Sequence, residues 1–358
     1  MFAGKRVLVT GHTGFKGSWL SFWLTELGAN VTGISIDIPT TPSNFATLPL
    51  ASRIDHRLGD VRDPAVLRDA LRDVQPEIVF HLAAQALVRR AYDEPRLTFE
   101  TNVMGVVNAL DAIKSACSVR AAVIITSDKC YENVGWDYGY REDDRLGGAD
   151  PYSASKAAAE IVFSSYSRSF MSSRLDLRVA SGRAGNVIGG GDWAADRIVP
   201  DCIRAWAEGR APKVRAPRAT RPWQHVLEPL SGYLWLAAGL INHRERLAGE
   251  SFNFGPAAEN DHTVADLIAE MRGTWPAPDF ELEGDGGKVE ASLLKLCCDK
   301  ALRRLSWEPT LTFREAARFT AEWYRDYYAG SPMSDRTSAQ LSEYVALAEA
   351  RSRAWTGR

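Results

Sequence analysis

The chain has 358 residues, of which 45% are hydrophobic and 25% charged, and its formal net charge is −2. This is ordinary globular composition, and the length predicts one large domain with a second lobe, or two domains. The nearly neutral charge gives no reason to expect nucleic-acid or membrane binding, and no apolar run reaches the roughly 18 residues that a membrane span requires.

The five cysteines show no spacing typical of a disulfide framework, and Cys297 and Cys298 are adjacent. We therefore expect reduced thiols in a cytoplasmic protein. No signal peptide is visible, because the chain leads from Met1 almost directly into a strand-like run. His and Cys do not cluster at the spacing of metal ligands, so we expect no metal site.

Short β-branched runs alternate with helical stretches in the first half of the chain. We expect strands at 6–10, 30–37, 77–82 and 121–126, and helices at 15–27, 64–74 and 96–116. Asp63 is the predicted N-cap of the helix that begins with Pro64. Strands separated by helices predict a parallel sheet covered on both faces, which is a doubly wound, Rossmann-type α/β fold.

The pattern changes after about residue 180, where glycines cluster. Residues 251–254 are a predicted strand, and the later helices are expected at 197–208, 226–241, 264–275 and 313–328. We expect residues 1–180 to form the main domain, with later segments returning to its sheet. Residues 181–330 should form mainly a smaller mixed α/β lobe. Residues 331–358 are a polar tail with a helical section near 339–350.

A glycine loop at residues 11–17, spaced G-x-x-G-x-x-G, joins the first strand to the first helix. Such glycines let the backbone turn tightly and approach a pyrophosphate that binds helix N–H groups. Asp37 follows at the end of the second strand, where a carboxylate accepts hydrogen bonds from a ribose diol and repels a 2′-phosphate. The loop and the acid predict a dinucleotide site and favour NAD over NADP, although Lys16 and Arg53 keep NADP open.

Further residues at the same edge of the sheet extend the predicted cofactor site. Asp60 could hold the adenine amino group, or its segment could instead cap a helix. Ala83 and Ala84 are small enough to let the nicotinamide ribose pass, and His81 before them is expected to be a structural hydrogen-bonding residue. The predicted cofactor contacts are Gly11, Thr13, Gly14, Phe15, Gly17, Asp37, Asp60, Val61, Ala83, Ala84, Asn102, Tyr152 and Lys156.

Tyr152 and Lys156 are spaced i, i+4 and therefore lie on one face of a helix, for which Asp150 is the predicted N-cap. A neighbouring ammonium favours the phenolate and should lower the pKa of the tyrosine. Such a pair can remove a hydroxyl proton while hydride leaves the same carbon.

Residues 126–131, Thr-Ser-Asp-Lys-Cys-Tyr, end the strand that precedes this helix. Ser127 could hydrogen-bond the same alcohol as Tyr152. Asp128 and Lys129 add an acid and an amine that a plain alcohol dehydrogenase does not need. The segment therefore indicates hydride transfer combined with a second reaction.

Over about residues 5–325 the chain resembles the extended short-chain dehydrogenase/reductase superfamily. Within it, the chain resembles the nucleotide-sugar 4,6-dehydratases. Where their general pattern is Thr-Asp-Glu, this chain has Ser-Asp-Lys at 127–129, followed by Cys-Tyr-Glu-Asn, and this resembles the CDP-glucose branch. The matching stretches are TGHTGFKGS (10–18), HLAAQ (81–85), TSDKCY (126–131), YSASK (152–156) and RPWQHV (221–226).

The resemblance implies a bound NAD and a three-stage reaction on CDP-glucose. Tyr152 would take the proton of the 4-hydroxyl as hydride leaves carbon 4. The 4-ketone acidifies carbon 5, and water is eliminated with Asp128 protonating the 6-hydroxyl. Hydride then returns to carbon 6, and a proton returns to carbon 5. Lys129 would act at carbon 5 as a base with a lowered pKa or by stabilising the enolate, or it is simply a charge partner of Asp128.

The resemblance also implies the substrate contacts. Arg221 would bind the pyrophosphate, since its guanidinium is planar and always charged. Asn186 and, more weakly, Asn253 would contact the sugar-phosphate side. Gln85 and Arg89 are expected to face the hexose. Residues 181–330 would thus form mainly the nucleotide-sugar-binding lobe.

The helices at 96–116 and 151–171 resemble the pair that forms a four-helix dimer interface in this superfamily. They predict a homodimer or homotetramer, unless their apolar side chains are buried against the sheet of the same chain. The apolar positions expected to be exposed are Val103, Val106, Val107, Leu110, Ile161 and Val162.

Two other functions compete with this interpretation. A different nucleotide-sugar dehydratase or an epimerase would share the fold, but an epimerase has no need for Asp128 and Lys129. A nucleotide-binding sensor would have no need for the pair of Tyr152 and Lys156.

Overall fold

The computed structural model describes residues 1–242, 245–257, 261–283 and 294–357. Its centre is a seven-stranded sheet in the order β11-β6-β5-β4-β1-β2-β3, in which all neighbouring strands are parallel. The strands are β1 (Arg6–Thr10), β2 (Asn30–Ser35), β3 (Asp55–Leu58), β4 (Ile78–His81), β5 (Ala121–Ile125), β6 (Arg178–Ala184) and β11 (Ser251–Phe254). The predicted doubly wound α/β fold is confirmed, and β11 shows that the later part of the chain returns to the sheet.

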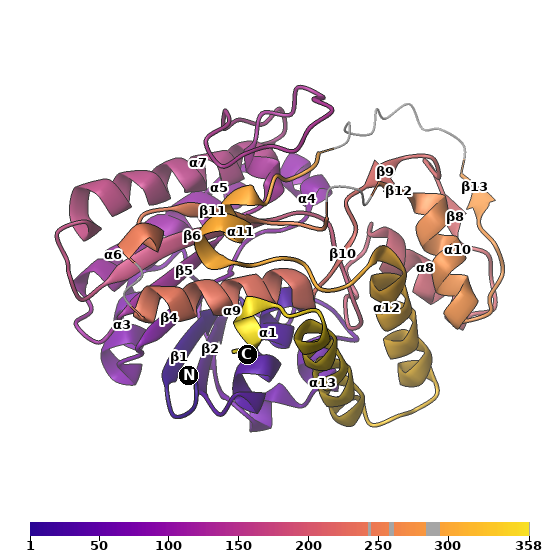
Figure 1. The fold of residues 1–358 in the computed structure, drawn as a ribbon, viewed down its shortest axis with the longest axis horizontal. Helices are drawn as coiled ribbons and strands as arrows, with labels where there is room; N and C mark the ends of the chain where they lie inside the picture. The colour runs from indigo at the N-terminus through magenta and orange to yellow at the C-terminus, as the bar shows by residue number, and fades with distance from the viewer. Residues whose placement is uncertain (243–244, 258–260, 284–293, 358) are drawn as a thin grey trace.

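Helices cover both faces of this sheet (Figure 1). Successive strand residues point to opposite faces, so Val7 and Val9 enter one core while Leu8 enters the other. The first core is covered by α1 (Phe15–Glu26) and α9 (Leu227–Ile241), and the second by α3 (Pro64–Val74), α6 (Gly105–Ser115) and α7 (Pro151–Tyr166).

The helix termini follow the predicted caps. The side chain of Asp63 accepts a hydrogen bond from the N–H of Ala65, and that of Asp150 accepts one from the N–H of Ser153. Both helices have proline in the first turn, where its missing N–H leaves no helical bond unmade. The second strand was expected to reach Asp37, but it ends at Ser35.

The predicted long helix at 96–116 is built from three helical pieces. These are α5 (Pro95–Phe99), the π-helical turn η2 (Glu100–Met104) and α6. Four of its apolar positions were expected to be exposed. This was wrong for Val106 and Leu110, which are buried in the core on one face of the sheet, while Val103 and Val107 are half-buried. Ile161 on α7 is 59% exposed, as expected.

The later part of the chain adds three two-stranded sheets and several helices beside the main sheet (Figure 1). The small sheets pair β7 (Val187–Ile188) with β10 (Gln224–His225), β9 (Thr220–Arg221) with β12 (His262–Thr263), and β8 (Lys213–Val214) with β13 (Glu281–Leu282). The helices are α8 (Ile198–Ala207), α10 (Val264–Thr274), α11 (Asp299–Leu305) and α12 (Phe313–Tyr328).

Short helical turns complete the described chain. They are α2 (Asn44–Thr47), α4 (Val88–Asp93), η1 (Leu50–Ser52), η3 (Asp128–Cys130), η4 (Ser167–Met171), η5 (Glu245–Leu247) and η6 (Ala354–Thr356). The five cysteines, all within the described ranges, are free. Among the described residues, no helix combines the length and the apolar character needed to span a membrane.

The polar tail is more ordered than its composition predicts. Helix α13 (Met333–Ala350) begins six residues before the expected helical section. Its Tyr344 is fully buried, and the hydroxyl donates to the carboxylate of Glu228 at 3.0 Å. The backbone N–H groups of Thr310 and Leu311 donate to the same carboxylate at 2.9 and 2.5 Å. Glu228 therefore fastens the C-terminal helix to α9.

The burial of Glu228 predicts that the stability of the protein depends on pH. Burial raises the pKa of Glu228 to about 7, so between about pH 4.5 and 7 the folded chain holds a proton that the unfolded chain has lost. The free energy of unfolding should therefore fall as pH rises through this window, by roughly 1.4 kcal/mol per pH unit. Urea unfolding of the wild type and Glu228→Gln at pH 5 and pH 8 should show this slope only in the wild type. Equal slopes would contradict it.

Candidate active site

The carboxyl ends of β1, β4 and β5 lie side by side at one edge of the sheet. Thr10 pairs in register with His81, and His81 pairs with Ile124. This places the glycine loop, the segment after β4 and the segment 126–131 together. The strand order reverses between β1 and β4, which is where open α/β sheets bind their ligands.

The glycine loop forms a cradle that side chains would fill. Gly11 has φ +74°, and a Cβ there would lie 2.8 Å from the backbone nitrogen of Ala83. A Cβ on Gly17 would lie 2.0 Å from the carbonyl oxygen of Gly11. The hydroxyl of Thr13 donates to the carbonyl of Asp37 at 2.6 Å, which ties the loop to the end of β2. The cradle fits the close backbone approach that a dinucleotide pyrophosphate needs.

Gly17→Ala should therefore lower both thermal stability and dinucleotide affinity, because the new methyl group meets a backbone oxygen that cannot move freely. We expect a loss of roughly 1–3 kcal/mol in the free energy of unfolding. Thermal melts with and without added NAD would measure both effects. Gly273→Ala is the matched control, since a Cβ there meets nothing within 4 Å. Equal melting temperatures for the two variants would contradict the cradle.

The acids beyond the loop have different surroundings. Asp37 is exposed, two residues beyond the end of β2, and its own carbonyl accepts the hydrogen bond of Thr13. Asp60 is paired with Arg62, whose Nε lies 2.8 Å from Oδ2, and this pairing holds the pKa of Asp60 below its usual range. The helix cap in this segment is Asp63 and not Asp60. Val61 is buried against Gly105 of α6.

The segment after β4 is held by hydrogen bonds to two helices. The amide of Asn102 accepts from the N–H of Gln85 at 2.8 Å and donates to its carbonyl at 3.1 Å and to Ser155 of α7 at 2.9 Å. The side chain of Gln85 is buried and bonds to Leu87 and Thr98. Both amides thus shape the loop between Ala83 and α4, and any contact of Gln85 with a hexose stays a prediction.

The predicted catalytic residues lie together at this edge. The hydroxyl of Ser127 donates to Oδ1 of Asp128 at 2.9 Å and accepts from the N–H of Lys129 at 3.2 Å. Asp128 is 4% exposed and so close to Gly185 that a Cβ there would lie 2.7 Å from its Oδ2. The ammonium of Lys156 lies 5.9 Å from the ring centroid of Tyr152.

The pKa of Tyr152 does not follow the sequence-based expectation. Burial raises it to about 12, although a hydrogen bond with Ser127 acts in the opposite direction. The expected lowering by the neighbouring ammonium was wrong for the free site, because removing the phenol from water outweighs nearby charge. Burial also lowers the pKa of Lys156 to about 8, while the charge of Glu160 raises it. The phenol is therefore protonated at neutral pH.

Two cations at this site were not predicted as site residues. Lys16, in the first turn of α1, interacts electrostatically with Asp128 and Lys156, and burial lowers its pKa to about 8. The charge of Arg197 favours the phenolate form of Tyr152. Its guanidinium also pairs with the carboxylate of Asp192 at 2.8 Å. The signal for Lys16 in the sequence is its position between Phe15 and Gly17 in the glycine loop.

The predicted substrate residues are more dispersed. Arg89 forms an ion pair with Asp196, and both side chains are 47% exposed. Asn186 and Arg221 are half-buried; Asn186 directly precedes β7, and Arg221 is the last residue of β9. Asn253 is completely buried, and its amide is bonded within the chain.

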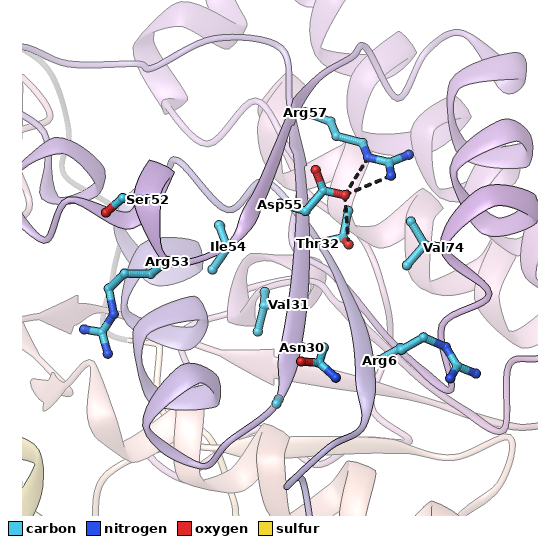
Figure 2. Close-up of a pocket in the computed structure, with 11 residues that line it drawn as sticks. Arg6, Asn30, Val31, Thr32, Ser52, Arg53, Ile54, Asp55, Arg57 and Val74 are labelled. Atoms are coloured by element: carbon cyan, nitrogen blue, oxygen red, sulfur yellow. Dashed lines mark hydrogen bonds and ion pairs between the residues drawn. The ribbon is translucent and has the colours of Figure 1, made fainter.

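A pocket of about 490 Å³ opens at the opposite ends of the strands (Figure 2). Its lining includes Arg6, Asn30 and Asp55, the first residues of β1, β2 and β3. Arg57 points toward Asp55 and bonds it at 2.8 Å. The pocket therefore lies away from the catalytic residues.

Comparisons with known proteins agree with this geometry. A family model described as GDP-mannose 4,6 dehydratase matches residues 8–320. CDP-glucose 4,6-dehydratase from Salmonella typhimurium is 45% identical over 347 residues, 96% of each chain. UDP-glucose 4-epimerase from Mycolicibacterium smegmatis is 27% identical over 90% of this chain and 99% of its own. The structure of DesIV, a dTDP-glucose 4,6-dehydratase from Streptomyces venezuelae with NAD and TYD bound, matches with TM-score 0.77 and 24% identity over 91% of this chain and 98% of its own.

Proposed function

This chain belongs to the GDP-mannose 4,6-dehydratase family, and we propose from that membership that it is an NAD-dependent CDP-glucose 4,6-dehydratase. It would convert CDP-glucose to CDP-4-keto-6-deoxyglucose and water. The observation that carries the proposal is the meeting of Tyr152, Lys156, Ser127 and Asp128 beside the glycine cradle. A hydride-transfer pair and a separate buried acid at one site support a reaction that combines redox chemistry with elimination.

The cofactor assignment is supported by the cradle of residues 11–17 and by Asp37 at the end of β2. When bound, NAD supplies the oxidant that takes hydride from carbon 4 and the hydride that is returned to carbon 6. The backbone N–H groups at the start of α1 would face its pyrophosphate, and Asp37 its ribose hydroxyls. Ala83 and Ala84 leave room next to the loop.

Each catalytic side chain would then move or hold one proton. Tyr152 removes the proton of the 4-hydroxyl, and the cations around it stabilise the phenolate that forms. Ser127 holds the substrate oxygen by a hydrogen bond. Asp128 delivers a proton to the departing 6-hydroxyl, so that it leaves as water.

We propose that Lys129 acts in the step at carbon 5, because it is next in the chain to Asp128 and its backbone N–H donates to Ser127. It is half-buried, at the rim of the site. As a base it would remove the carbon-5 proton that the 4-ketone has acidified and return a proton to carbon 5 when hydride reaches carbon 6. As a cation it would stabilise the enolate, with another group moving the proton. Exchange of the carbon-5 hydrogen with solvent separates the roles, because Lys129→Met abolishes this exchange only if the amine is the base.

The substrate assignment is tested by turnover of CDP-glucose, dTDP-glucose, UDP-glucose and GDP-mannose by the purified protein. The product carries a 4-keto sugar with a characteristic absorbance in base. We expect a keto product with CDP-glucose and little with the other three. A keto product with another nucleotide but not with CDP-glucose would overturn the base specificity and leave the reaction type standing.

We also propose that the protein works in the cytoplasm as at least a dimer, through helices 96–116 and 151–171. Four exposed apolar side chains on the outer surface of these helices support this, because large exposed hydrophobic side chains that lie together mark contact surfaces. They are Phe99 (39% exposed), Met104 (48%), Ile161 (59%) and Phe170 (46%). Light scattering of Ile161→Asp should give a smaller mass than the wild type, whereas an unchanged mass would exclude this surface.

A further inference from the structure

A buried ion pair lies behind the catalytic lysine. Glu160 follows Lys156 by four residues on α7, so the two side chains lie one turn apart on one face. Its carboxylate is 2.6 Å from Nη2 of Arg183 on β6, and the two side chains are only 1% and 4% exposed. Ser181 and Ser251 also donate hydrogen bonds to the same oxygen of Glu160, at 3.1 and 2.9 Å. The pair thus joins α7 to β6 and β11.

Both ends of the catalytic segment 126–131 are attached to this ion pair. At the beginning of the segment, the hydroxyl of Thr126 donates to the second carboxylate oxygen of Glu160. At its end, Arg183 donates to the hydroxyl of Tyr131 at 2.7 Å, and the guanidinium lies 5.0 Å from the ring centroid. Ser127, Asp128 and Lys129 lie between these two anchors.

The attachment continues through Asn253 on β11. The hydroxyl of Tyr131 donates to its side-chain oxygen at 2.8 Å. Its side-chain nitrogen donates to the carbonyls of Tyr140 and Cys297 at 2.9 and 3.1 Å. The amide of Asn253 is therefore used inside the protein, where it holds Tyr131, and its contact with substrate stays a prediction.

Stability alone does not account for such a pair. Removing two charges from water costs several kcal/mol, and a well-packed apolar pair of similar size is often at least as stable. Nε of Arg183 is buried without a hydrogen-bond partner among the described residues, which adds to the cost. Although burial acts to raise it, the pKa of Glu160 is held below its usual range by Arg183, so the carboxylate stays charged.

Glu160 is the one negative charge that acts on Lys156 among the described groups around it. Burial raises the pKa of the Cys130 thiol and lowers that of His81 to about 3, so both side chains are neutral near pH 7. The groups that interact with Lys156 are Cys130 on η3, His81 on β4, Lys16 on α1, and Tyr152 and Glu160 on α7.

We propose that the Glu160–Arg183 ion pair is a positioning pair for catalysis, which fixes the segment 126–131 against α7 and keeps Lys156 an ammonium. The inference rests on the proposed function, because it assigns a purpose to residues that act only through Tyr152, Lys156 and Asp128. Neither member of the pair needs to touch the substrate.

The test is the pH dependence of kcat/KM for Glu160→Gln. Loss of the carboxylate removes the charge that opposes deprotonation of Lys156. The fall of kcat/KM at high pH, the alkaline limb of the profile, should therefore move to lower pH by about one unit. The shift alone leaves about half of Lys156 protonated at pH 7. Because the hydrogen bond from Thr126 that holds the catalytic segment is weakened as well, we expect kcat at pH 7 to fall further, roughly 10-fold in all. Glu228→Gln is the matched control, because it removes an equally buried carboxylate on α9 and should leave the alkaline limb in place.

The double variant Glu160→Gln/Arg183→Met distinguishes a loss of positioning from a general loss of folding. Without either charge, no unpaired ion is buried, and the melting temperature should recover toward that of the wild type. The alkaline limb should remain shifted, since the negative charge is still missing. A limb that stays at the wild-type pH in both Glu160 variants would overturn the proposal. Failure of the proposed function is seen separately, as wild-type protein that does not act on CDP-glucose, and the limb is then measured with the nucleotide sugar that it accepts.

Discussion

Tyr152→Phe should reduce turnover by about 10³-fold, within the range of 10²–10⁴ that proton transfer by a positioned side chain contributes. The phenol is 9% exposed and its pKa is raised by burial to about 12, so the proton that it exchanges with the substrate cannot be replaced easily by bulk water. Oxidation at carbon 4 is the step that needs this oxygen. In a single turnover, the variant should show almost no rise in absorbance at 340 nm, the signal of reduced nicotinamide.

The same variant should bind substrate and cofactor nearly as well as the wild type, because only one oxygen atom is removed. Tyr166→Phe is the matched control, since it makes the same change at the far end of α7, outside the catalytic edge. Tryptophan fluorescence titrations with NAD and with CDP-glucose would check binding. A Tyr152→Phe enzyme that still reduces its cofactor at the wild-type rate would exclude the tyrosine as the proton acceptor.

The fold could be predicted from the sequence because its signals are local. The runs before residues 10, 82 and 126 are apolar and β-branched, and the caps Asp63 and Asp150 are read directly from the chain. The tail was the exception. Tyr344 of α13 is buried where it bonds to Glu228 of α9, and no local pattern reports a partner that lies 116 residues away.

The site could be predicted where chemistry and spacing coincide, as for Tyr152 with Lys156. The role of a residue could not be predicted where it depends on neighbours that are distant in the chain. Asn253 lies within β11 and Gln85 follows β4, and the folded chain uses both amides internally. Glu160 continues the face of Tyr152 and Lys156 by one more turn, a signal that the sequence contains. Its meaning depends on Arg183 of β6, which only the sheet brings near.

Asp128→Asn should separate the two halves of the reaction. The amide keeps the size of the carboxyl group but cannot deliver a proton to the 6-hydroxyl, while Tyr152 and Lys156 are untouched. Oxidation at carbon 4 should proceed and elimination should stop, so the absorbance at 340 nm rises in a single turnover and then persists. Formation of the 4-keto-6-deoxy sugar should fall by about 10²–10⁴-fold.

The control for this change is Asp137→Asn, an exposed acid in the loop that follows the catalytic segment, which should retain full turnover. The persistence of reduced cofactor is the decisive signal, because a general loss of folding would lower oxidation and elimination together. A variant that loses the 340 nm signal along with the product would place Asp128 at the oxidation step. The acid of the elimination would then have to come from another group at the same edge, of which Lys129 is the nearest in the chain.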